Sequence, residues 1–179
     1  MTKKFLLFAA LVCTVLTGFT LTSCGGDEPK GEKEVTEFTG KYTITMAEDV
    51  LAVADVYVSY KGNNNENKMD KITSTIWSKK VSSKTFPAEM GIKYRFQPKQ
   101  GAKLKERYEM SFMVALSGKV VTGSTEKGNF IQSKTVLGAK FVPAAKVDDL
   151  LKAKSNQSYA FVVDKEGNAT KTDKMTFSF

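Results

Sequence analysis

Apolar and polar residues alternate along most of the chain beyond residue 35, and this period of two is typical of half-buried β-strands. The clearest case is Ile92, Tyr94 and Phe96, with Lys93 and Arg95 between them. Similar runs, bounded by turn residues such as Gly, Asn and Ser, predict further strands. The predicted strands are 38–46, 55–60, 71–77, 92–96, 108–116, 130–137, 159–163 and 175–179.

One segment has a different period. Val147, Leu150 and Leu151 are spaced by three or four residues, which is the spacing of one face of a helix. Pro143 stands where the first turn would begin, a position that tolerates proline because its missing N–H needs no partner there. The sequence therefore predicts a short helix over 143–154, which crosses from one sheet to another.

About eight strands with turn signals between them predict an all-β sandwich. The region after the helix resembles the last two strands of an immunoglobulin-like domain, because Ser158-Tyr159-Ala160-Phe161 is followed by a Gly-Asn turn and a final strand. This resemblance implies that Tyr159 occupies the tyrosine-corner position. Its ring would then lie in the core, and its hydroxyl would bond to backbone upstream.

The middle of the chain supports the same fold class. The segments 73–79 (TSTIWSK), 86–91 (FPAEMG) and 96–99 (FQPK) are similar to small immunoglobulin-like lipoproteins of Bacteroidota-type bacteria, most of which have no assigned function. The similarity extends over most of residues 35–179 and implies a fold and a location, not an activity. The alternative is an up-and-down lipocalin-like barrel, because 38–42 is similar to the first strand of such lipoproteins, although their Trp is absent here.

The N-terminus reads as an export signal. Lys3 and Lys4 precede a stretch from 5 to 23 without a charged residue, which is the profile of a secretory signal. Its end, Leu21-Thr22-Ser23-Cys24, resembles the lipobox of bacterial lipoproteins. That resemblance implies a signal peptide over 1–23 and a lipid attached to Cys24, the first residue of the mature protein. Multiple acyl chains would make this anchor stable.

The alternative for the same stretch is an uncleaved membrane helix. It has 19 residues, close to the ~20 that span a bilayer, but threonines and a glycine dilute its second half. Gly25 after the cysteine resembles lipoproteins sent to the outer membrane, and Asp27 with Glu28 resembles a weak surface-export signal. Residues 24–34 are predicted to be a flexible tether, and residues 35–179 the folded domain.

Composition excludes several kinds of chemistry. The chain has no histidine, and its only cysteines are Cys13, in the signal, and Cys24. The expected domain therefore has no disulfide, no metal site and no cofactor. The net charge is +8, yet only Arg95 and Arg107 are arginines. Nucleic-acid recognition favours Arg, so the lysines are interpreted as solubility charge and no nucleic-acid partner is expected.

Motifs that could support catalysis are weak. Ser124 and Lys127 match S-x-x-K, but Gly residues bracket them as a loop. The acidic pairs are Glu48 with Asp49, Glu106 with Glu109 and Asp148 with Asp149; we expect them to face water rather than each other across a cleft. The acids near Asp164 fit a hairpin turn better than a calcium loop. No catalytic residue is assigned, and the protein is not expected to be an enzyme.

Binding is the remaining class of function. By alternation Trp77 faces away from Ile72 and Ile76, so it would be an exposed platform for sugar rings if that face is solvent, and Tyr57 could extend it. The alternative, which we favour, places Trp77 in the core. The sequence thus predicts an outer-membrane-anchored, non-enzymatic binding or interaction module with a glycan or protein ligand. A carbohydrate-binding module for glycan uptake and a structural lipoprotein of a surface complex, with an open sheet edge, remain alternatives.

Overall fold

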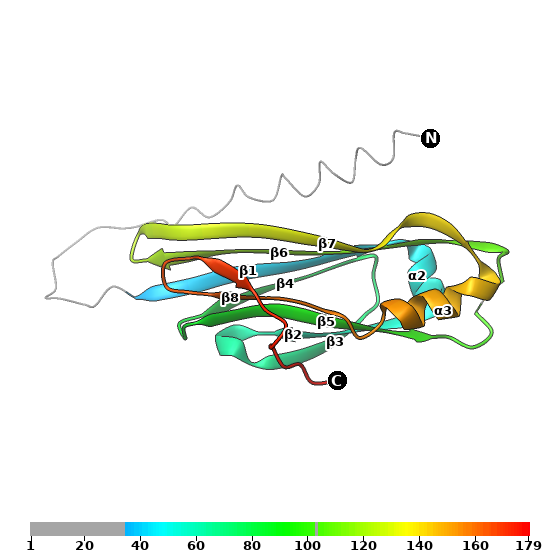
Figure 1. The fold of residues 1–179 in the computed structure, drawn as a ribbon, viewed down its shortest axis with the longest axis horizontal. Coiled ribbons are helices and arrows are strands. Elements are labelled where there is room, and N and C mark those ends of the chain that lie inside the picture. Colours follow the sequence, from blue (N-terminus) through cyan, green and yellow to red (C-terminus); the bar gives the residue numbers. More distant parts are fainter. Residues whose placement is uncertain (1–34, 103) are drawn as a thin grey trace, which may run out of the picture. The chain divides into compact units, whose positions relative to one another are not determined.

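The computed structural model describes residues 35–102 and 104–179, which form two packed antiparallel sheets (Figure 1). Sheet A contains, in order across the sheet, β4 (Ile76–Ser83), β1 (Thr36–Met46), β6 (Arg107–Thr122) and β7 (Thr125–Pro143). Sheet B contains β3 (Asn67–Ile72), β2 (Ala54–Lys61), β5 (Ala88–Pro98), β8 (Ser158–Val163) and β9 (Ala169–Lys171). The predicted all-β sandwich is confirmed.

The core lies between the sheets and consists of the alternating apolar positions that the sequence predicted. Tyr42 and Ile44 of β1, in sheet A, and Ile92 and Tyr94 of β5, in sheet B, are fully buried members of this core. The apolar set of β6 from Tyr108 to Leu116 is buried in the same way. Because successive strand side chains point to opposite faces, each strand contributes one row to this core and one to the outside.

Two helices connect the sheets. Helix α3 (Ala144–Lys154) joins β7 of sheet A to β8 of sheet B and buries Val147 and Leu151, so the predicted crossing helix is confirmed. Helix α2 (Glu48–Val53) joins β1 to β2 in the same manner. It was not predicted, because six residues are too few to establish a helical period.

The predicted strand 71–77 is wrong, because the chain changes sheets within it. Strand β3 ends at Ile72 in sheet B, the chain bends, and β4 begins at Ile76 in sheet A. This crossing resets the alternation, so Ile72 is buried whereas Ile76 is 50% exposed. Hydrogen bonding holds the bend to the end of β1, where the Met46 N–H donates to the carbonyl of Thr75.

The predicted closing strand 175–179 is also wrong. The last strand is β9, and residues 175–179 contain no regular secondary structure. They lie over the outer face of sheet B instead, the face turned away from sheet A. A side chain at Gly91 would collide there with Met175 and Phe177. The segment therefore covers the sheet rather than extending it.

Both sheets are open in the part of the chain that the structure describes. Strands β4 and β7 flank sheet A and strands β3 and β9 flank sheet B, each with one neighbour. A closed barrel requires every strand to have two neighbours. The lipocalin-like alternative is therefore wrong. The longest of these edge strands is β7, with 19 residues.

Candidate binding face

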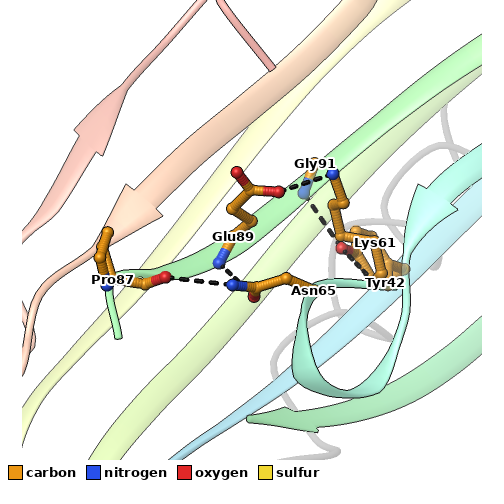
Figure 2. A network of polar contacts seen from close by, with 6 residues as sticks. All are labelled: Tyr42, Lys61, Asn65, Pro87, Glu89 and Gly91. Carbon is orange, nitrogen blue, oxygen red and sulfur yellow. Dashed lines mark hydrogen bonds and ion pairs between the residues drawn. The ribbon is translucent and has the colours of Figure 1, made fainter. Parts of the chain in front are cut away.

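A polar network closes the gap where β2 and β5 separate (Figure 2). Direct pairing of these strands ends at Tyr60 and Ile92. At the next position the hydroxyl of Tyr42, from the other sheet, donates to the Lys61 carbonyl at 2.9 Å and accepts the Gly91 N–H at 3.0 Å. One side chain thus satisfies two buried backbone groups. Burial raises the pKa of the Tyr42 hydroxyl, so it stays protonated and able to donate.

The same network continues along the seam through side chains. The buried Lys61 ammonium lies 2.6 Å from the Glu89 carboxylate. Asn65 accepts the Glu89 N–H at 2.8 Å and donates to the Pro87 carbonyl at 3.2 Å. As Figure 2 shows, these contacts fasten the loop after β2 to the start of β5. Lys61 and Glu89 therefore neutralise each other within the protein.

The asparagines before Asn65 hold the other side of the same loop. Asn63 accepts the Ser82 N–H at 2.9 Å and Asn64 accepts the Lys84 N–H at 3.3 Å. The 3₁₀ turn η2 (Asn63–Asn65) therefore clamps the connection between β4 and β5. Its amide groups are engaged within the protein, so we assign it a structural role.

Trp77 lies in the core, and the idea of an exposed platform at this residue is wrong. Only 9% of its surface is exposed, and its ring packs against Tyr60 at 5.3 Å and Tyr42 at 6.5 Å between ring centres. Its indole N–H donates to Asp70 at 3.1 Å. The crossing at residues 73–75 turned Trp77 inward, so the alternative that placed it in the core is confirmed.

Tyr57 lies on the outer face of sheet B, half-buried between two cations. The strand register places it opposite Lys71 in β3 and Arg95 in β5. The Lys71 ammonium lies 5.7 Å from the centre of the Tyr57 ring, and the Arg95 guanidinium carbon lies 5.2 Å from it. Both distances are within the range of cation–π attraction. The Tyr57 ring therefore lies between two positive charges and is not an exposed platform for a sugar ring.

Residues 175–179, which we call the covering segment, add a second aromatic ring beside Arg95. The Phe179 ring centre lies 4.9 Å from the Arg95 guanidinium carbon and 5.8 Å from the Lys93 ammonium. Cations and rings thus alternate across the face in the order Lys71, Tyr57, Arg95, Phe179 and Lys93. We call these five residues the cation–aromatic row. Of these five residues the sequence pattern indicates Tyr57 alone, since the row depends on the pairing of strands far apart in the chain.

One carboxylate touches this row in the described part of the chain. Asp55 accepts Lys71 at 3.0 Å and Lys99 at 3.6 Å. The hydrogen bond and charge of Lys71 hold the pKa of Asp55 below its usual value. Lys71 is therefore partly neutralised, whereas the two cations on β5 are not paired by Asp55.

Tyr159 bridges the sheets. Its side chain is buried, and its hydroxyl donates to the Ser133 carbonyl in β7 at 3.3 Å. Burial raises the pKa of this hydroxyl. The expected buried ring and upstream backbone bond are both present. The acceptor, however, lies 26 residues upstream in the opposite sheet, so the bond links two layers rather than one local corner.

The residues considered for catalysis are dispersed. Ser124 lies in the exposed turn between β6 and β7, and Lys127 is exposed near the start of β7. Asp49 accepts Lys105 at 2.6 Å and the Glu109 N–H at 2.7 Å. Partial burial would raise the pKa of Asp49, but these two hydrogen bonds outweigh it and lower the pKa below its usual value. The ionised Asp49 therefore links α2 to β6 through a hydrogen bond.

The hydrogen bonds of Asp164, in the acidic turn after β8, are made within the turn itself. Asp164 accepts the N–H groups of Glu166 and Asn168 through Oδ1, at 3.0 Å and 2.8 Å, and the Asn168 side chain through Oδ2. The bond from the Asn168 side chain is the main cause of the lowered pKa of Asp164. Gly167 has a φ of +87° and touches the backbone of Gly128, so a side chain would not fit. Turn geometry accounts for these acids.

Other surface features are shallow. Two open depressions border helix α3, beside Pro98 and Lys152. Within residues 35–102 and 104–179, no group of three acidic or sulfur side chains is arranged to hold a metal ion. No helix in this range is long and apolar enough to span a membrane. Cys24, the signal 1–23 and the tether 24–34 lie outside the described residues.

No protein-family model matches this chain, and no curated protein matches it either.

Proposed function

We propose that this protein is an exported lipoprotein, anchored in the outer membrane through Cys24, that binds a ligand without transforming it. The lipobox Leu21-Thr22-Ser23-Cys24 supports the anchor. The cation–aromatic row carries the proposal of binding, because it presents unpaired positive charge on an ordered sheet face. The absence of histidine from the sequence supports a role other than catalysis.

The anchor is tested by replacing each cysteine in turn. Cys24→Ala removes the thiol that accepts the lipid, so this variant should lose labelling by radioactive palmitate and move from the membrane to the soluble fraction. Cys13→Ala is the matched control, because Cys13 lies inside the proposed signal, and it should label and sediment normally. Sedimentation of Cys24→Ala with carbonate-washed membranes would show instead that residues 5–23 form a spanning helix.

A structural role in a surface complex is the second candidate, and strand β7 favours it. This edge strand exposes Ile131 (56%) and Phe141 (61%) beside unpaired backbone groups. Open edges can pair with a strand of another protein. Native electrophoresis of detergent extracts tests this role. An assembly that dissociates in Ile131→Lys and Phe141→Lys, but not in Lys127→Gln, would support it, whereas a wild-type monomer would not.

A further inference from the structure

We infer that the cation–aromatic row binds an acidic polysaccharide, a ligand that carries carboxylate or sulfate groups along its chain. This inference rests on the proposed function as an exported binding lipoprotein, and it names the ligand. Three properties of the row support this ligand: unpaired donors, ordered cations and covered ring faces.

The first property is an excess of donors. Lys93 and Arg95 are neighbours on the outer face of β5 and make no ion pair with any described residue; their side-chain contacts are with the rings of Tyr57 and Phe179. Residues two positions apart on a strand are separated by about 7 Å. One ligand with two acidic groups can therefore engage both cations.

The second property is order. Contacts with two rings, from β2 and from the covering segment, restrict the Arg95 side chain, so little rotamer entropy remains to be lost on binding. Its Nε–H is buried and has no hydrogen-bond acceptor in the described part of the chain. A buried donor without a partner is costly. An oxyanion held at the guanidinium would supply the charge-assisted hydrogen bonds that the protein itself does not.

The third property excludes a neutral sugar as the preferred ligand. A neutral sugar binds an aromatic platform through the face of the ring. Here Lys71 and Arg95 contact the Tyr57 ring, and Arg95 and Lys93 contact the Phe179 ring. Among the described residues, the three cations of the row are matched by one side-chain carboxylate, that of Asp55, so the row offers net positive charge to solvent. Charge complementarity therefore selects a polyanion.

The test measures binding of the full-length protein, solubilised in a non-ionic detergent, by isothermal titration calorimetry. Heparin supplies sulfate groups in addition to carboxylates, polygalacturonate supplies carboxylates alone, and dextran is the neutral comparison. Arg95→Gln removes the central one of the three charges of the row, and Arg95→Lys keeps that charge but loses the planar fork. Lys140→Gln removes the same charge from strand β7 in the other sheet and is the matched control. Thermal unfolding of each variant verifies that it folds.

We expect at least one of the two polyanions to bind and dextran not to bind. Arg95→Gln should weaken binding by about tenfold or more, because a charge-assisted hydrogen bond is lost, and Arg95→Lys should fall between it and the wild type. Lys140→Gln should stay within about twofold, since its contribution is only long-range and screened. Preference for heparin or for polygalacturonate would identify the acidic group.

Three results would overturn the inference. Equal weakening by Arg95→Gln and Lys140→Gln would mean that diffuse charge binds polyanions, not the row. Failure of both polyanions to bind would exclude this ligand class. Binding to phosphatidylglycerol vesicles in place of the polysaccharides would assign the row to a lipid surface. None of these results affects the anchor, which the cysteine variants test separately.

Discussion

The hydroxyl of Tyr42 accepts the backbone N–H of Gly91 at 3.0 Å, and this bond joins the two sheets at the point where β2 and β5 separate. The hydroxyl also donates to the Lys61 carbonyl. Tyr42→Phe removes both bonds and leaves two buried backbone groups unsatisfied, so the variant should lose about 2–4 kcal/mol of unfolding free energy. Tyr159→Phe, which breaks one longer bond, should lose less. Equal stability of Tyr42→Phe and wild type in urea unfolding would refute this account.

Trp77 provides a direct optical measure of the core, because the sequence contains no other tryptophan. Its ring lies among Tyr42 and Tyr60, so its fluorescence should be blue-shifted and poorly quenched by iodide, and should shift to the red on unfolding. Addition of a polysaccharide should leave the emission unchanged. A red-shifted native spectrum would place Trp77 in solvent and contradict the packing described above.

The contribution of Asn65 to stability can be separated into a side-chain part and a backbone part. This residue makes two side-chain bonds and has a φ of +66°. Asn65→Ala loses the bonds and also strains the backbone, so it should cost about 2 kcal/mol or more. Asn65→Gly loses the same bonds but tolerates the positive φ, so it should cost less. Chemical denaturation compares them; the reverse order would show that the backbone angle is not a constraint.

Gly91 should control whether residues 175–179 cover sheet B. A methyl group at Gly91 would collide with Met175 and Phe177, whereas Gly138 in β7 has no atom within 4 Å of the added carbon. Gly91→Ala should therefore release the covering segment, and Gly138→Ala should not. Digestion with carboxypeptidase, followed by mass spectrometry, should remove residues 175–179 faster from Gly91→Ala only. Unchanged protection in that variant would mean that the segment is held elsewhere.

Asp49 should make stability depend on pH in the acid range. Its pKa in the folded protein lies below the ordinary value of 3.8, so its contribution is fully present above that value and is lost as the pH falls through the lower folded-state pKa. Asp49→Asn should therefore be less stable than the wild type at neutral pH, and the difference should shrink between about pH 5 and about pH 2. Asp173→Asn, at an exposed position, serves as the control in urea unfolding at each pH. A constant difference across this range would argue against an ionised Asp49.

Sequence analysis predicted most strands because alternation is a local property of the extended backbone. The two wrong strands share one cause. The run 71–77 contains a crossing between sheets that no residue marks strongly, and the run 175–179 alternates like a strand although it lies across a sheet. In both cases the pattern of apolar residues fits a regular strand as well as it fits the place that the segment occupies in the fold. Only packing against β1 or over Gly91 distinguishes them.

The candidate site shows the same division. Tyr57 is out of phase with the buried Val56 and Val58, and this alternation correctly places it outside the core. Its neighbours could not be predicted, since Lys71 and Arg95 reach it through two different strand pairings. The lipid anchor at Cys24 belongs to the opposite case: it depends on a contiguous motif and stays a prediction of the sequence.

The sequence alone therefore determined which residues alternate, where the crossing helix α3 lies and that the chain contains no histidine, because each of these is set by neighbouring residues or by composition. The tertiary structure decided the strand order β4-β1-β6-β7, the inward turn of Trp77 and the assembly of the cation–aromatic row. Those features depend on register between distant segments. Register is selected by the burial of a whole sheet face at once, and no single segment contains that information.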